Sequence, residues 1–186
     1  MKIAIVYFSG TGNTAKLAEA VLEGARSGSG VEAELLAIEG KDIVEGRYAN
    51  DAVLASLDAA DAIIFGSPTY MGGPAGQFKA FADATAGRWF GQQWKDKLAA
   101  GFTVSNSPSG DKLNTLQYFQ ILAAQHGMLW VTLGLLPNVE PAGLNRLGSF
   151  GGAMGQAGQL ELSDLDKATG RALGERVASV GLKLKA

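Results

Sequence analysis

The sequence predicts an α/β protein, a doubly wound parallel sheet in a single domain that spans residues 1–186. Short apolar runs alternate with segments of helical periodicity along the whole chain, which is the pattern of βαβ units. Most of these runs are nearly continuous, as strands covered on both faces require. The length of 186 residues and the hydrophobic content of 47% also suit one compact core.

Five strands are predicted, and four of them are almost wholly apolar. The second strand differs, because carboxylates alternate with apolar side chains and one of its faces therefore meets solvent. This alternation favours a position at the edge of the sheet. In chain order the predicted strands are Ile3 to Phe8, Val31 to Leu35, Ala62 to Phe65, Leu98 to Val104, and Met128 to Leu133.

Five helices are expected between and after these strands. The first carries an apolar stripe at three- and four-residue spacing from Leu17 to Ala25, and the last begins at a capping signal, Ser163-x-x-Asp166. The other three are expected at Ala52 to Leu57, Gln77 to Thr85, and Lys112 to His126. Two stretches, Ile38 to Asn50 and Gly134 to Leu162, are predicted as loops. The second is long enough to indicate a function or an additional element of its own.

Composition excludes several classes of protein. The formal charge is −2 and the sequence pI is about 5.4, so there is no broad basic field for nucleic acid. The absence of cysteine excludes disulfides and cysteine-ligated clusters, and the single histidine, His126, excludes a histidine-rich metal site. No apolar stretch is long enough to cross a bilayer and no signal peptide is visible, so we expect no membrane partner and a cytoplasmic location.

Residues 9–14, Ser-Gly-Thr-Gly-Asn-Thr, follow the first strand and open the first helix. At such a position, backbone N–H groups and the positive end of the helix dipole create an anion site. The glycines allow a tight turn, and the polar side chains add donors. The expected ligand is a terminal phosphate monoester, held by Ser9, Gly10, Thr11, Gly12, Asn13 and Thr14.

Two other interpretations of this segment remain open from the residues alone. Gly10-x-Gly12-x-x-Ala15 also satisfies the relaxed dinucleotide fingerprint, although a lone match is weak and three hydroxyls suit a phosphate that ends there. The segment is also compatible with an ordinary turn capped by Ser9 or Asn13. The nucleoside-triphosphate P-loop signature is absent.

Two further polar segments follow the third and fourth strands. Ligands of open α/β sheets lie beyond the carboxyl ends of the strands, so these segments are expected to meet residues 9–14. Tyr70 and Met71 supply an apolar wall for a heteroaromatic ring, and Asn106 can hydrogen-bond its edge. The expected ring-binding residues are Pro68, Thr69, Tyr70, Met71 and Gly72 from one segment, and Ser105, Asn106, Ser107, Gly110 and Asp111 from the other.

The first of these motifs resembles the phosphate loop of flavodoxins, in which Ser9-x-Thr11-Gly12-Asn13-Thr14 would hold the 5′-phosphate of FMN. More of the chain resembles the flavodoxin-like NAD(P)H:quinone oxidoreductases first named tryptophan-repressor-binding proteins. The similar segments are Ala62 to Tyr70, Gly76 to Phe78, Ala86 to Trp89, Leu122 to Met128, and Gly148 to Ala153. The resemblance implies strand order 2-1-3-4-5, non-covalent FMN, NADH or NADPH as reductant, and a quinone as the acceptor of two electrons.

The resemblance also implies roles for three single residues. His126 would lie by the flavin, Trp89 would line the nicotinamide or quinone pocket, and Phe150 stands in a glycine-rich loop where the family has tyrosine. His126 precedes the fifth strand, at the end of the sheet opposite its own flavin segments, so it reaches a flavin only across an interface in a homodimer or homotetramer. The alternatives are a histidine at a helix C-terminus and aromatic residues that only pack.

Two other functions are compatible with an FMN domain. One is a flavodoxin that carries single electrons between protein partners, and the other is a flavin-binding module that senses redox state. Electron carriers usually present a strongly acidic face, which a net charge of −2 fits poorly. The long loop and the tryptophans favour the oxidoreductase.

Overall fold

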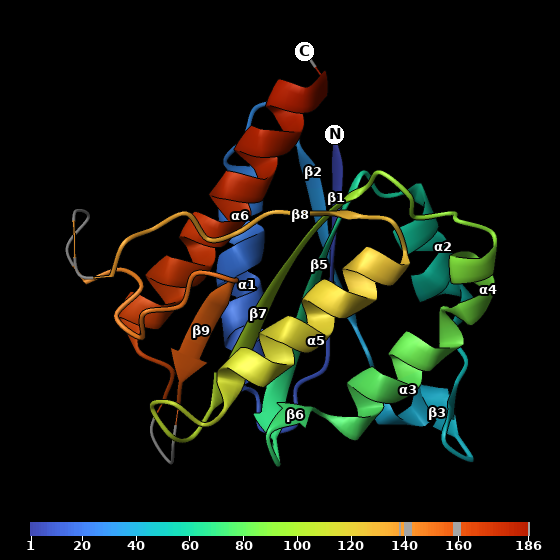
Figure 1. Cartoon of the computed structure of the whole chain (residues 1–186), viewed down its shortest axis with the longest axis horizontal. Coiled ribbons are helices and arrows are strands. Elements are labelled where there is room, and N and C mark those ends of the chain that lie inside the picture. Colours follow the sequence, from blue (N-terminus) through green and yellow to red (C-terminus); the bar gives the residue numbers. More distant parts are fainter. Residues whose placement is uncertain (138, 140–142, 158–160, 186) are drawn as a thin grey trace.

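The computed structural model describes residues 1–137, 139, 143–157 and 161–185. A largely parallel sheet lies at the centre, with helices on both of its faces (Figure 1). The predicted α/β class with a parallel sheet is therefore confirmed. Of the predicted loop between Gly134 and Leu162, residues 138, 140–142 and 158–160 lie outside the described part of the chain.

The sheet contains seven strands rather than the predicted five. Its main path runs β2-β1-β5-β7-β8, all parallel, while β6 pairs antiparallel with β5 and β9 pairs parallel with β7. The strands are β1 (Lys2–Tyr7), β2 (Glu32–Ala37), β5 (Ala62–Tyr70), β6 (Gly73–Pro74), β7 (Leu98–Ser105), β8 (Leu129–Trp130) and β9 (Ala153–Gln156). The strand with alternating carboxylates, β2, lies at the edge as expected.

The prediction of a single fifth strand over residues 128–133 was wrong, because two short strands share that edge of β7. β8 pairs with Leu98 and Ala99, whereas β9 pairs with residues 102–105. The exchange occurs at Gly101. A Cβ added there would lie 2.9 Å from the Trp130 ring, and one added at Gly152 would meet the Gly101 carbonyl oxygen. The indole of Trp130 donates to the Gly151 carbonyl at 2.9 Å, which joins the two pieces. The long predicted loop thus contains an element of its own.

Two layers of helices cover the sheet (Figure 1). One apolar core forms where α1 (Asn13–Arg26) and α6 (Asp164–Lys185) lie against one face. A second core forms on the other face, beneath α2 (Asp51–Ala59), α3 (Gly76–Ala84) and α5 (Lys112–Gln125). The Ser163 hydroxyl accepts from the Asp166 N–H at 3.2 Å, so the predicted capping signal of the last helix is confirmed.

Several short elements lie where the sequence predicts loops. A short helix, α4 (Ala86–Phe90), follows α3, and residues 38–50 contain a 3₁₀ turn, η1 (Gly40–Asp42), and a small antiparallel pair, β3 (Ile43–Val44) with β4 (Arg47–Tyr48). Strand β5 continues to Tyr70, five residues beyond the predicted end. These segments are too short or too rich in glycine and proline for periodicity to reveal them.

Helices α1 and α6 approach each other through small residues. A Cβ added at Gly174 would meet the Val21 carbonyl oxygen and lie 2.6 Å from the Ala25 nitrogen. One added at Gly24 would meet the Arg171 carbonyl in the same way. Backbone atoms cannot move aside as a flexible side chain can, so this helix pair depends on glycine at both contacts.

We therefore expect Gly174→Ala to destabilise the fold by about 1–3 kcal/mol, since the cost of overpacking exceeds the gain in helix propensity. Gly87→Ala is the matched control, because Gly87 is also helical but a Cβ there would meet nothing within 4 Å. The control should gain up to about 1 kcal/mol. Urea unfolding of both variants measures the difference, and equal stability of the two would contradict the packing described.

Candidate functional site

A cavity of about 710 Å³ opens at the carboxyl edge of the sheet, where three segments meet. They are the turn from β1 into α1, the β5–β6 hairpin and the segment from β7 into α5. Two residues of the lining, Val104 and Ala157, were not among the predicted site residues. The lining comprises Thr11, Asn13, Thr14, Pro68, Thr69, Tyr70, Met71, Gly72, Val104, Ser105, Asn106, Ser107, Gly110, Asp111 and Ala157.

The first segment turns tightly into α1. Gly12 has φ 90°, a left-handed conformation that favours glycine, and its carbonyl accepts from the Lys16 N–H at 3.1 Å. The Ser9 hydroxyl oxygen accepts from the Ala15 N–H at 3.1 Å, so Ser9 caps the helix while its own proton stays free to be donated. Within the described part of the chain, the N–H groups of residues 12–14 give no hydrogen bond. These amides and the helix dipole form an anion-binding turn.

The β5–β6 hairpin forms a second wall. Met71 has φ 48° and is fully exposed, and Gly72 has φ 80°, so the turn holds its tip away from the core. The Tyr70 hydroxyl lies over Gly10, where a Cβ on that glycine would collide with it. The Asn114 amide donates to the Gly72 carbonyl at 2.6 Å and ties the hairpin to α5.

Thr69 lines the cavity, and its side chain also joins three elements of the fold. Its hydroxyl is hydrogen-bonded to those of Thr103 and Thr115, each at 2.8 Å, and the three residues are buried. These bonds fix the end of β5 to β7 and α5. Thr69 therefore both lines the cavity and holds its wall in place.

The third segment, residues 105–111, is organised by a residue that the sequence analysis missed. Lys112 has no exposed surface, and its ammonium donates to the Ser105 hydroxyl at 2.8 Å and to the carbonyls of Ser107 and Pro108, each at 2.9 Å. Burial lowers the pKa of Lys112 to about 8. The available signal was a lysine in the first turn of a helix, where the dipole disfavours a cation.

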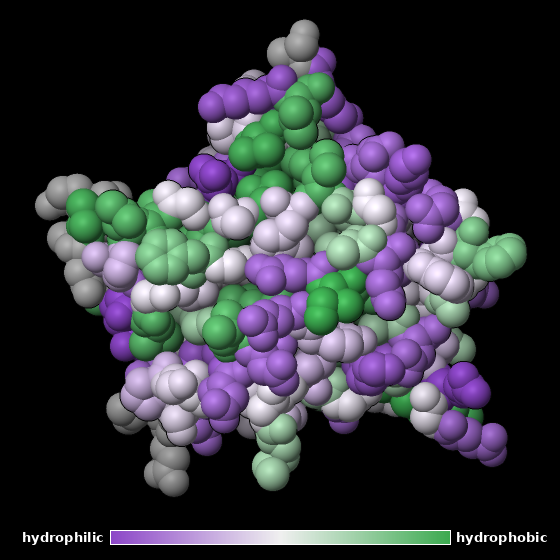
Figure 2. Space-filling view, in the orientation of Figure 1, coloured by the Kyte–Doolittle hydropathy of each residue, from purple (hydrophilic) through white to green (hydrophobic). Residues whose placement is uncertain are grey.

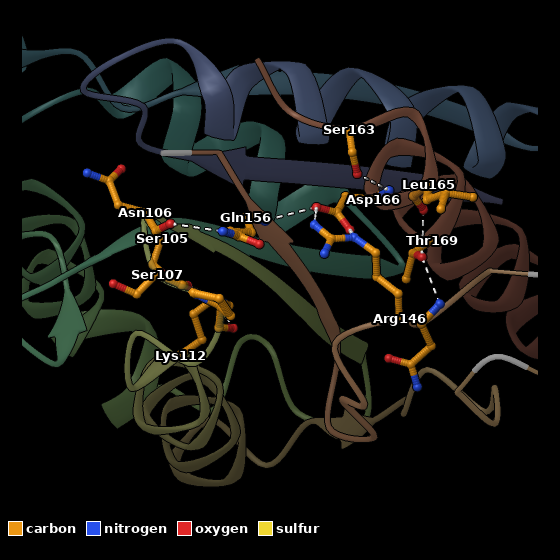
Figure 3. Close-up of polar contacts among 12 residues, drawn as sticks. Ser105, Asn106, Ser107, Lys112, Arg146, Gln156, Ser163, Leu165, Asp166 and Thr169 are labelled. Carbon is orange, nitrogen blue, oxygen red and sulfur yellow. Dashed lines mark hydrogen bonds and ion pairs between the residues drawn. The ribbon is translucent and has the colours of Figure 1, made fainter. Parts of the chain in front are cut away.

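An ion pair with a buried carboxylate supports this segment from the side of α6 (Figure 3). Arg146 donates twice to Asp166, at 2.8 and 2.7 Å, and Asp166 also accepts from the Gln156 N–H at 2.9 Å. The Gln156 amide reaches the Asn106 carbonyl at 3.4 Å. Strand β9 is thereby connected to the cavity wall. The capping signal at Ser163 was the only sequence feature that pointed toward Asp166.

Trp89 and His126 border a second hollow of about 430 Å³, formed by α3, α4 and α5. The Trp89 side chain is about half exposed, whereas His126 is 1% exposed and its Nε2 lies 2.9 Å from the Thr85 hydroxyl. Burial lowers the pKa of His126, which disfavours the charged ring that a cationic cap of the helix would need. The ring packs on Trp94 with centroids 4.5 Å apart, and its Nδ1 has no hydrogen-bond partner in the described structure.

Of the three predicted catalytic residues, Trp89 and His126 border one hollow, and Phe150 does not join them in one copy of the chain. His126 also lies far from the cavity. It follows the last residue of α5, whereas residues 105–111 precede the first, and a helix of 14 residues is about 20 Å long. Phe150 is 56% exposed and lies outside both hollows, beside Gly151, which approaches the Gln120 side chain. No cluster of three or more potential metal ligands occurs among the described residues, and no described helix has the length and hydropathy of a membrane span.

Comparison with known proteins agrees with this geometry. A family model described as NADPH-dependent FMN reductase matches residues 1–136. The chain is 40% identical to a flavodoxin, FldP, of Pseudomonas aeruginosa, over 100% of this chain and 99% of that protein. It is 37% identical to an NAD(P)H dehydrogenase (quinone) of Archaeoglobus fulgidus, over 98% of each.

A solved structure also has the same fold as this chain. A flavodoxin, WrbA-like protein from Agrobacterium tumefaciens is 47% identical and superimposes with a TM-score of 0.79 over 98% of each chain. The fold is therefore flavodoxin-like. Since the family model covers well over half of the sequence, the chain belongs to the NADPH-dependent FMN reductase family, a family of oxidoreductases that use FMN.

Proposed function

We propose that the cavity at the carboxyl edge of the sheet binds FMN. The phosphate would lie at residues 9–14 and the ring between residues 68–72 and 105–111. The observation that carries this proposal is the convergence of three segments on one cavity, one of which presents unpaired helix amides. The volume of about 710 Å³ falls within the usual range for small-molecule sites.

The residues present fit this cofactor. The free amides of residues 12–14, together with the hydroxyls of Ser9, Thr11 and Thr14, suit a doubly charged phosphate with no cation inside the turn. Tyr70 and Met71 offer an apolar surface to a ring system, and the backbone of residues 105–110 offers polar groups to its edge.

The proposed reaction is reduction of a quinone by NADH or NADPH through FMN, in steps of two electrons. The bound flavin supplies the chemistry of accepting a hydride and passing it on. The protein fixes the ring, leaves one of its faces accessible and excludes water from the rest. The quinone dehydrogenase names of relatives at 33–37% identity support this activity.

The active site would be completed by a second copy of the chain. Trp89 and His126 share a hollow that lies about the length of α5 from the cavity, so within one copy they cannot touch its ring. The exposed face of α5 carries Leu113 and Ile121, and Figure 2 shows apolar residues among polar ones over this helix. A homodimer or homotetramer that apposes these surfaces would bring Trp89 of one copy toward the cavity of another.

The second candidate function is electron transfer between proteins, which the name of the FldP relative favours. An oxidoreductase should oxidise NADH or NADPH in the presence of a quinone and should be photoreduced in one step of two electrons. A carrier should show no turnover and should be photoreduced in two separate steps. Steady-state assays beside stepwise photoreduction therefore distinguish the two functions, and we expect turnover.

The phosphate site can be tested by comparing FMN with riboflavin, which lacks the phosphate. Thr11→Ala removes a hydroxyl that lines the cavity, so FMN affinity should fall about tenfold or more while riboflavin affinity stays unchanged. Thr132→Ala, on the surface, should alter neither. Fluorescence titration of the apoprotein measures all three proteins. An equal loss for both ligands would place the phosphate elsewhere.

The shared active site can be tested on α5. Ile121→Glu places a charge on an exposed apolar position beside the second hollow, so we expect dissociation of the assembly and loss of quinone reduction, with FMN binding retained. Leu184→Glu changes an equally exposed leucine on α6 and is the control. Light scattering gives the mass of each variant. Full activity in a monomeric Ile121→Glu variant would contradict the proposal.

A further inference from the structure

Lys112 is the most deeply buried cation among the described residues, and nothing in the family assignment explains it. Its side chain has no exposed surface, and all three of its protons are donated to one short segment, residues 105–108. Figure 3 shows Lys112 beside Ser105 and Ser107. Both of these residues line the cavity, so the ammonium lies one residue behind the cavity wall.

This arrangement is costly for the fold. Burial disfavours the charged form, and the first turn of α5 places the ammonium at the positive end of the helix dipole. The opposing carboxylate of Asp166 already forms a bidentate pair with Arg146. A lysine that carries both of these costs, burial and the helix dipole, is expected to have a function in the site that it contacts.

The backbone of residues 105–111 shows which conformation the Lys112 ammonium stabilises. Gly110 and Asp111 are both left-handed, with φ 53° at each, and a Cβ on Gly110 would collide with the Ser105 hydroxyl. The segment therefore folds back on itself, and the carbonyls of Ser107 and Pro108 point inward to the ammonium. Without the ammonium, the Pro108 carbonyl would lose the hydrogen bond from Lys112, and the Ser107 carbonyl would keep the bond from the Ser105 hydroxyl, at 3.0 Å.

We propose that Lys112 is a positioning residue for the flavin, which shapes residues 105–108 to receive the ring and whose charge favours the reduced cofactor. This inference rests on the proposed FMN site. Hydride transfer from NADH or NADPH brings two electrons and one proton, so the ring gains one negative charge. A fixed, buried cation behind residues 105–107 stabilises that charge, and the reduction potential rises.

The charge would act within a small set of groups. Asp166 of α6 and Arg146 of the preceding segment influence Lys112 through their own charges, in opposite directions. Asp111, the N-cap residue immediately before Lys112, lines the cavity. The Asp166–Arg146 pair is nearly neutral as a unit, so the ammonium supplies the local positive charge behind residues 105–107.

The test compares three variants of the full chain. Lys112→Met removes the charge and the hydrogen bonds at similar volume, and Lys112→Arg keeps both. Lys97→Met is the matched control, because Lys97 is also partly buried with a lowered pKa and donates to the carbonyls of Leu57 and Asp58, at the opposite edge of the sheet. The measurements are FMN affinity of the apoprotein and the reduction potential of bound FMN against a reference dye.

We expect Lys112→Met to weaken FMN binding about tenfold or more and to lower the reduction potential, with partial recovery in Lys112→Arg. Lys97→Met should change neither quantity, although it loses stability. If wild-type protein fails to bind FMN, the proposed function and this inference both fail. If it binds and Lys112→Met matches it in affinity and potential, this inference alone is wrong. Weaker binding at an unchanged potential would refute the role of the charge.

A pH profile of the wild-type protein covers the case in which Lys112→Met does not fold. The pKa of Lys112, about 8, predicts that FMN affinity falls as the pH is raised from 7 to 9, because the ammonium then loses a proton and a hydrogen bond. Lys97→Met should show the same fall. A flat profile in both proteins would overturn the proposal.

Discussion

The parallel pairing of β5 with both β1 and β7 is the constraint on which the rest of the molecule depends. Strand β1 pairs with β5 only as far as Tyr7 and Gly66, whereas β5 and β7 stay paired through Pro68 and Val104. This difference in length leaves a step at the carboxyl edge of the sheet. The turn into α1 lies where β1 has ended, and the longer ends of β5 and β7 form a wall beside it. The position of the cavity is therefore a consequence of register, and the β5–β6 hairpin and residues 105–111 complete its walls.

The same constraint explains which parts of the fold could be predicted. Strands of a sheet covered on both faces are continuous apolar runs, and helices packed on it carry an apolar stripe. These two patterns predicted the five longer helices and the central strands. The predicted strand stopped at Phe65 because glycine and proline interrupt the strand pattern over residues 66–70. Pro68 is tolerated in β5 because β1 has already ended beside it, so no ladder bond is lost on that side. The division of the outer edge between β8 and β9 depends on contacts of Gly101 and Trp130, which lie far apart in sequence.

The parts of the candidate site that consist of one continuous segment could be predicted from the sequence. The parts that depend on three-dimensional packing could not. Residues 9–14 combine glycines, hydroxyls and a helix start, and each of these features can be seen locally. Lys112 could not be identified in this way, since lysine is nearly always exposed and its burial follows from the course of residues 105–111. His126 was expected at a helix end, and it lies there, but the burial that lowers its pKa follows from packing on Trp94 and Thr85.

The electrostatics of the cavity also distinguish it from the rest of the surface. The chain has a net charge of −2, yet the N-termini of α1 and α5 both point their positive ends toward this one cavity. The first presents unpaired amides, and the second carries the ammonium of Lys112 behind it. The carboxylate of Asp111 lies at the rim, where water screens it, while the amides and the ammonium are fixed in place. A site with a positive field at both ends suits a ligand that has an anionic phosphate and whose ring becomes anionic on reduction. The same arrangement of helices therefore favours both binding and reduction.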